Sequence, residues 1–152
     1  MKKKNLLWTF FIFYIGIVLK LTIFRQHTMD EHAWNFSLFV QLIEVYYTNG
    51  LWPFLRLFLG NIGWFVPFGF LIPFLWQRKT FWKVTCGGCL FSFLIEVLQF
   101  IFRKGYAELD DLILNTLGCM LGYGIYHFFT KTKWKRRKNF SNEQPKKMEK
   151  IS

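Results

Sequence analysis

Four long apolar runs divide this chain, and charged residues gather between and beyond them. The runs cover about residues 6–24, 57–76, 82–102 and 109–129. Each is about 20 residues long, the length that an α-helix needs to cross a hydrocarbon core of roughly 30 Å. The pattern therefore predicts an all-α integral membrane bundle of four transmembrane helices.

The first run could also be the apolar part of a signal peptide, because Lys2, Lys3 and Lys4 precede it. No small-residue cleavage site follows it, however, and Lys20 and Arg25 close it. We therefore expect this run to be kept as a transmembrane helix.

The link between the first two runs is long and has a pattern of its own. Its middle, residues 34–47, is mostly apolar, and polar residues recur there at steps of four, three and four: Ser37, Gln41, Glu44 and Thr48. This is a narrow polar stripe on a helix too short to span. We predict an interfacial helix over 34–47 on the outer side, continued at the interface by 51–58. The alternative, a fifth and shortened span, would place the C-terminus outside.

Composition supports a membrane protein. The chain is 53% hydrophobic and 22% aromatic, more than a soluble domain of this size could bury. The net charge of +11 could suggest nucleic acid. The basic residues stand at the ends of the apolar runs, however, and not along a periodic helix face. We therefore expect membrane lipids, and no nucleic acid, as partners.

The basic residues also predict the orientation. Three precede the first run, three lie between the second and third runs, and nine follow residue 130, which puts 15 of the 20 on one side. The positive-inside rule then places both termini in the cytoplasm. We divide the chain into a membrane domain, 1–130, and a basic cytoplasmic tail, 131–152, which we expect to be disordered. The tail could anchor the topology or lie against anionic lipid.

The third run carries a polar stripe. Its members recur at alternating steps of four and three and so share one helix face: Thr85, Cys89, Ser92, Glu96, Gln99 and Arg103. The residues between them are apolar. A charge that faces lipid is costly, so this face should meet protein or a water-filled cavity.

The fourth run repeats the pattern with Asp111, Asn115, Gly118 and Gly122 at steps of four, three and four. The two glycines would let a neighbouring helix approach closely. With the predicted topology, Asn61 lies near the outer end of the second span. We therefore expect one outer level to hold polar side chains from three helices: Asn61, Glu96, Gln99, Asp111 and Asn115.

This polar level has two interpretations. Its side chains could have only a structural role, as hydrogen bonds between helices. Ionisable groups inside a membrane are nevertheless costly, and they usually mark a functional site. The residues alone leave both interpretations open.

Three stretches of the chain resemble the VanZ-like family of bacterial membrane proteins: G-N-I-G-W-F-V-P-F-G-F-L-I-P, F-L-I-E-V-L-Q-F and E-L-D-D-L-I-L-N-T-L-G-C-M-L-G-Y. They fall within about residues 60–129. The matching positions are Asn61, Pro67, Gly69, Glu96, Gln99, Asp111, Asn115, Gly118 and Gly122. The family usually has an Arg in a turn before the acidic pair, whereas here Lys104 precedes Gly105 and follows Arg103. Lysine binds a phosphate or carboxylate less well than arginine, which can form two parallel hydrogen bonds to it.

The resemblance implies a role in the bacterial cell envelope, linked to low-level resistance to the glycopeptide teicoplanin. We expect a multi-pass protein of the bacterial cell membrane whose outer site binds a lipid-linked cell-wall precursor or an amphipathic drug. The expected ligand-binding residues are Asn61, Glu96, Gln99, Arg103, Lys104, Asp110, Asp111 and Asn115. The expected helix-packing residues are Pro67, Gly69, Gly118 and Gly122.

Two other functions stay open on this sequence. Glu96 and Asp111 could act as acid and base, or hold a divalent ion, in an enzyme that acts on a lipid-linked cell-wall substrate. Alternatively, the protein could be a structural partner of another membrane protein.

The remaining motifs are weak. The pair Cys86 and Cys89 has the C-x-x-C spacing of redox and metal sites, but no second pair accompanies it, and small-residue helix packing explains it better. His27, His32 and His127 share no helix face. We therefore expect neither a metal site nor a cofactor.

Overall fold

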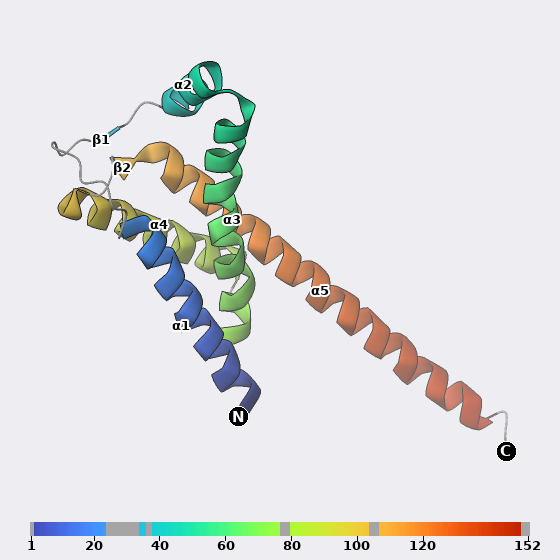
Figure 1. The fold of residues 1–152 in the computed structure, drawn as a ribbon. Coiled ribbons are helices and arrows are strands. Elements are labelled where there is room, and N and C mark those ends of the chain that lie inside the picture. Colours follow the sequence, from blue (N-terminus) through green and yellow to red (C-terminus); the bar gives the residue numbers. More distant parts are fainter. Residues whose placement is uncertain (1, 24–33, 36–37, 77–79, 104–106, 150–152) are drawn as a thin grey trace.

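Five helices make up the architecture of the computed structural model (Figure 1), which describes residues 2–23, 34–35, 38–76, 80–103 and 107–149. The helices are α1 (Lys2–Ile23), α2 (Val40–Asn49), α3 (Leu51–Leu75), α4 (Phe81–Phe102) and α5 (Leu109–Glu149). Two short strands, β1 (Trp34–Asn35) and β2 (Ala107–Glu108), complete the described elements. The predicted all-α fold is confirmed.

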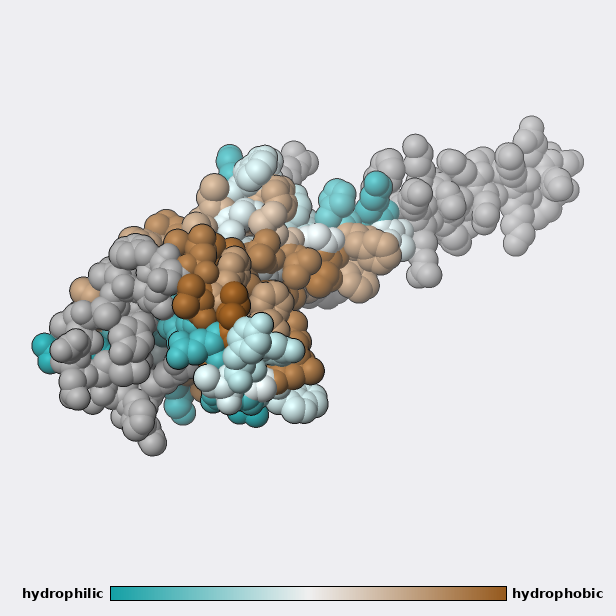
Figure 2. Space-filling model, turned by 90° about the horizontal axis from the view of Figure 1, so that it is seen from above, coloured by the Kyte–Doolittle hydropathy of each residue, from teal (hydrophilic) through white to brown (hydrophobic). Residues whose placement is uncertain are grey.

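Four of these helices contain segments long and apolar enough to cross a membrane: Lys4–Thr22, Leu51–Leu75, Phe81–Phe102 and Leu109–Thr132. Large apolar side chains are also highly exposed on them, for example Phe13 at 68%, Trp82 at 71% and Phe128 at 69%. Figure 2 shows hydrophobic residues over much of the described surface on the face it presents. Such a surface suits lipid and not water. The chain thus has the four predicted spans.

The described ends of α1 and α5 that are nearest the chain termini lie toward the same end of the bundle, and α2 lies at the opposite end (Figure 1). The second span is longer than predicted, because residues 51–58 form the first two turns of α3 and not a separate interfacial segment. Gly50, with φ 86°, makes the turn between α2 and α3. Pro53 is tolerated because backbone N–H groups in the first turn of a helix have no intrahelical partner.

The helix predicted over 34–47 begins only at Val40. Trp34 and Asn35 instead pair in parallel with Ala107 and Glu108, directly before α5. The apolar period of this segment did not distinguish a helix from a short strand, because the strand's partner lies about 70 residues away in the sequence.

The tail also differs from its prediction. Helix α5 continues to Glu149, through the segment predicted to be disordered. The first part of this segment is rich in Lys and Arg, which are good helix formers, and it continues a helix that is already nucleated in the fourth span.

Close backbone contact joins α3 and α5. A Cβ atom built on Gly118 would overlap the carbonyl oxygen of Ile62, and one on Gly122 would overlap that of Val66. From the other side, a Cβ on Gly69 would overlap the carbonyl oxygen of Cys119. Only glycine fits at these three positions, so this contact fixes how α5 lies against α3.

The apolar core lies beside this contact. It takes buried side chains from four helices: Phe11, Val18, Phe65, Phe68, Ile72, Leu75, Val84, Ile95 and Cys119. Pro67 stands in α3, and in the turn before it the carbonyl of Trp64 accepts a hydrogen bond from the Tyr14 hydroxyl of α1. Backbone acceptors near a proline in a transmembrane helix are often used in this way by a neighbour.

We predict that Gly118→Ala destabilises the protein by about 1–3 kcal/mol, the usual cost of forcing an extra group into a packed interior. The added methyl must push α3 and α5 apart. Gly124→Ala is the matched control, because it lies on the same helix and no atom lies within 4 Å of the added Cβ. Reversible unfolding in detergent measures both. Equal stability of the two variants would show that the close contact is not required.

Candidate functional site

Polar side chains from three helices meet at the end of the bundle that faces α2. We call the following residues the polar cluster: Asn61 on α3, Ser92, Glu96 and Gln99 on α4, and Asp110, Asp111 and Asn115 on α5. Of the stripe predicted on the third run, Thr85, Ser92, Glu96 and Gln99 are buried. The stripe therefore faces protein, as expected for polar groups in a membrane helix.

One face of α5 bonds to both neighbouring helices. The Asn61 amide group donates a hydrogen bond to Oδ1 of Asp111, which joins α3 to α5. One turn along the same face, Nδ2 of Asn115 donates to Oγ of Ser92 at 2.8 Å, which joins α5 to α4. Of the five side chains predicted to share one depth, Asn61 and Asp111 are thus in direct contact.

Glu96 bonds to the chain just before α5. Its side chain is only 3% exposed, and Oε2 accepts the backbone N–H of Glu108 at 3.0 Å. A carboxylate this deep in an apolar bundle needs such donors, because lipid offers none. Glu96 therefore fixes the point at which the chain turns back from α4 into α5.

Asp110 bonds to the start of α2, whereas its neighbour Asp111 bonds to α3. Both carboxylate oxygens of Asp110 accept the backbone N–H of Phe39, each at 2.9 Å, and the side chain is 4% exposed. Phe39 caps α2 in a left-handed conformation with φ 58°, which non-glycine residues rarely adopt. Asp110 thus holds the start of α2 against the start of α5.

Gln99 extends the cluster to α1. Its Nε2 donates to the carbonyl oxygen of Thr22 at 3.3 Å, in the last turn of α1, where carbonyl groups lack helical partners. The oxygen of the same amide group differs from the nitrogen in its hydrogen bonding. Oε1 of Gln99 is buried and has no hydrogen-bond partner within the described part of the chain.

Arg103 ends α4 with φ 53° and an exposed side chain, and its N–H bonds to the Phe100 carbonyl at 3.3 Å. It lies at the same end of the bundle as the polar cluster. Lys104, the other expected basic residue, lies outside the described residues. Within the described ranges, no group of three or more His, Cys, Asp or Glu side chains could hold a metal ion.

Sequence reasoning found the side chains of the cluster but missed most of their partners. Phe39 and Glu108 contribute backbone N–H groups, and Thr22 contributes a carbonyl oxygen. Backbone groups leave no signal in the residue pattern, since every residue has them. The polar cluster is rich in hydrogen-bond acceptors, and one buried acceptor, Oε1 of Gln99, has no donor among the described residues.

We predict that Asp110→Ala loosens the start of α2 while the bundle stays folded. A hydrogen bond to a charged group contributes about 1.5–3 kcal/mol, so local opening near Phe39 should increase roughly 10- to 100-fold. Hydrogen exchange of peptides over residues 38–49 measures it. Glu44→Ala, at an exposed position on α2, is the control. Unchanged exchange in Asp110→Ala would show that this carboxylate does not hold α2.

Comparison with known proteins identifies the family to which the chain belongs. The family model described as VanZ/LLP1 matches residues 11–130. Protein VanZ of Enterococcus faecium is 32% identical over 76 residues, which is 50% of this chain and 47% of that protein. The aligned part thus spans about half the length of the curated relative that it matches. No solved structure matches the chain. Since the family model covers most of the chain, the protein is a multi-pass membrane protein of the VanZ/LLP1 family.

Proposed function

We propose that the polar cluster binds the polar head of a lipid-linked or amphipathic ligand at the outer leaflet of the bacterial cell membrane. The observation that carries this proposal is the buried Oε1 of Gln99, which has no donor within the described residues. Leaving such an acceptor unsatisfied costs about 1–3 kcal/mol. A hydroxyl or amide N–H of a ligand would satisfy it.

The surroundings of Gln99 support a ligand that carries hydrogen-bond donors. Glu96 lies one turn earlier on α4, and Asp111 and Asp110 stand at the start of α5. Sugar hydroxyls and peptide N–H groups are donors of this kind, and both glycopeptides and lipid-linked cell-wall precursors carry them. The exposed Arg103 supplies a bidentate donor for a phosphate or carboxylate on such a ligand.

The proposed orientation of the protein in the membrane is based on the distribution of its Lys and Arg residues. Fifteen of the 20 Lys and Arg residues fall on the side of the termini in the predicted topology. This distribution supports cytoplasmic termini and a polar cluster on the outer side. There it would meet compounds that reach the membrane from outside. The chain belongs to the VanZ/LLP1 family, and the teicoplanin resistance that the VanZ-like resemblance implies supports teicoplanin as the drug to test.

Binding accounts for the geometry better than catalysis does. Oε2 of Glu96 accepts the Glu108 N–H, and Oδ1 of Asp111 accepts from Asn61. An acid–base pair must exchange protons with a substrate, whereas these oxygens hold α3, α4 and α5 together. A fixed set of acceptors is instead suited to orienting a ligand.

We predict that Gln99→Leu abolishes protection against teicoplanin and lowers stability by no more than about 1.5 kcal/mol. The substitution removes a buried acceptor that has no donor among the described residues, together with the bond from Nε2 to the Thr22 carbonyl. A neutral hydrogen bond of this kind contributes about 0.5–1.5 kcal/mol. Susceptibility is measured in a Gram-positive host that lacks a homologue, with membrane levels matched by immunoblot and the thermal midpoint measured on purified protein.

Glu44→Gln, on the exposed face of α2, is the control and should protect like wild type. If the polar cluster serves only to bond the helices to one another, protection against teicoplanin will depend on protein stability alone. A stable Gln99→Leu variant will then protect fully. If wild type itself does not protect, the proposed link to teicoplanin fails, although ligand binding can still be tested directly.

A further inference from the structure

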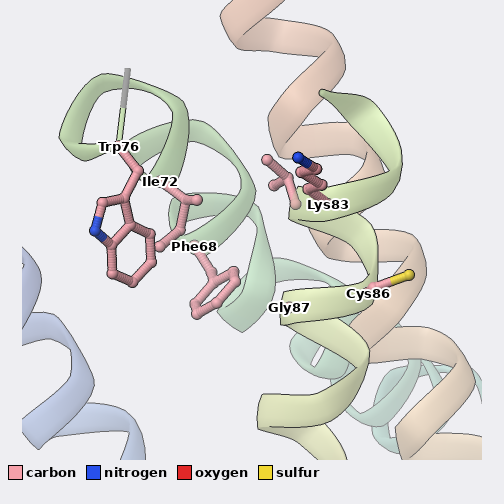
Figure 3. Close-up of a pocket in the computed structure, with 7 residues that line it drawn as sticks. Phe68, Ile72, Trp76, Lys83, Cys86 and Gly87 are labelled. Carbon is pink, nitrogen blue, oxygen red and sulfur yellow. The ribbon is translucent and has the colours of Figure 1, made fainter. Parts of the chain in front are cut away.

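A cavity lies at the other end of the bundle, far from the polar cluster. It has a volume of about 320 Å³ and lies between the last turns of α3 and the first turns of α4. Figure 3 shows Phe68, Ile72 and Trp76 along α3, with Lys83, Cys86 and Gly87 on the neighbouring turns of α4. None of these residues belongs to the site described above.

The walls of this cavity change from apolar to amphipathic. Phe68, Ile72 and Val84 are buried at 8%, 4% and 1% exposure. Trp76 is 49% exposed, and Lys83 is exposed. The cavity therefore has an apolar interior and a rim that carries an indole and an ammonium group, the two groups typical of the membrane–water interface.

The rim of the cavity also lies at the depth in the membrane that its side chains favour. Trp76 directly follows the span Leu51–Leu75, and Lys83 lies in the first turn of the span Phe81–Phe102. The ends of transmembrane segments lie at the level of the lipid head groups. The apolar interior then lies beside the acyl chains.

The rim is also electropositive. The first turn of α4 has no acidic residue, and its N-cap, Thr80, makes no side-chain capping bond. Within residues 4–22, 38–76, 80–103 and 108–132, the acidic side chains belong to α2, the second half of α4, β2 and the start of α5: Glu44, Glu96, Glu108, Asp110 and Asp111. Lys83 adds a full charge to the positive end of the α4 dipole. An anion at this rim would meet no competing carboxylate among them.

We propose that this cavity is a binding site for an anionic phospholipid of the leaflet at this end. One acyl chain enters between Phe68, Ile72 and Val84, and the phosphate lies at Lys83. The volume is roughly ten times the 30 Å³ that one water molecule occupies, which is enough for part of one chain. By the charge distribution of the loops, this leaflet is the cytoplasmic one.

Gly87 provides a direct way to close the cavity. It lines the cavity, and no atom lies within 4 Å of a Cβ built there. Gly87→Leu therefore adds a side chain at the cavity wall whose Cβ meets no backbone atom, and replacing glycine within a helix favours folding. Gly124→Leu is the matched control, because its Cβ also meets nothing within 4 Å, and Gly124 does not line the cavity.

The test is native mass spectrometry of purified full-length protein from mixed micelles that contain equal amounts of phosphatidylglycerol and phosphatidylcholine. Wild type and Gly124→Leu should retain phosphatidylglycerol preferentially, and Gly87→Leu should lose most of the retained lipid. Lys83→Gln should reduce the preference for phosphatidylglycerol about fivefold, because one basic residue near anionic lipid contributes about that factor. Millimolar inorganic phosphate should not displace the lipid, because it has no acyl chain.

Three results would overturn the proposal: no retained lipid in wild type, equal retention in Gly87→Leu and Gly124→Leu, or displacement by inorganic phosphate. The thermal midpoint of each variant verifies folding. If Gly87→Leu does not fold, Gly87→Ala and Lys83→Gln make the same test, since one narrows the cavity and the other removes its charge. This proposal does not depend on the function of the polar cluster.

Discussion

A polar side chain inside a transmembrane bundle must find its hydrogen-bond partners within the protein, because lipid supplies none. The polar cluster satisfies this constraint with bonds between distant parts of the chain. Asn61 bonds to Asp111, 50 residues away, and Asn115 bonds to Ser92, 23 residues away. Asp110 reaches across 71 residues to Phe39. Each bond joins two elements, so the need to satisfy polar groups also defines how one end of the bundle is assembled.

Helix α5 combines this bonding with close packing on a single face. Asp111 and Asn115 occupy the part of that face nearest its start, and Gly118 and Gly122 continue it deeper into the bundle. The glycines bring the α5 backbone against the carbonyl groups of Ile62 and Val66. That approach places the start of α5 beside Asn61. Packing therefore positions the polar groups, and the polar groups keep the helices in register.

The sequence predicted those parts of the structure that depend on periodicity. Four apolar runs gave four spans. Four members of the polar stripe, Thr85, Ser92, Glu96 and Gln99, proved to be buried, because a helix repeats its face every three to four residues. Periodicity could not show where α2 begins. That boundary is set by Phe39, whose N–H bonds to Asp110. Nor could it show that Gln99 turns toward Thr22, because a backbone carbonyl is the same at every position.

The two ends of the bundle differ in chemistry. One end is rich in carboxylate and amide acceptors, and the other has an apolar cavity with Lys83 at its rim. Our two proposals follow from this difference: they assign donor-rich ligands to one end of the bundle and an anionic lipid to the other.

The central claim is that hydrogen bonds between helices assemble the polar cluster, and a double-mutant cycle between Asn61 and Asp111 tests it most directly. The free energy of unfolding in detergent is measured for wild type, Asn61→Ala, Asp111→Ala and the double variant. Our account predicts a favourable coupling energy of about 0.5–2 kcal/mol, the range measured for hydrogen bonds between transmembrane helices. A coupling energy of zero would contradict it, because the two side chains would then contribute to stability independently.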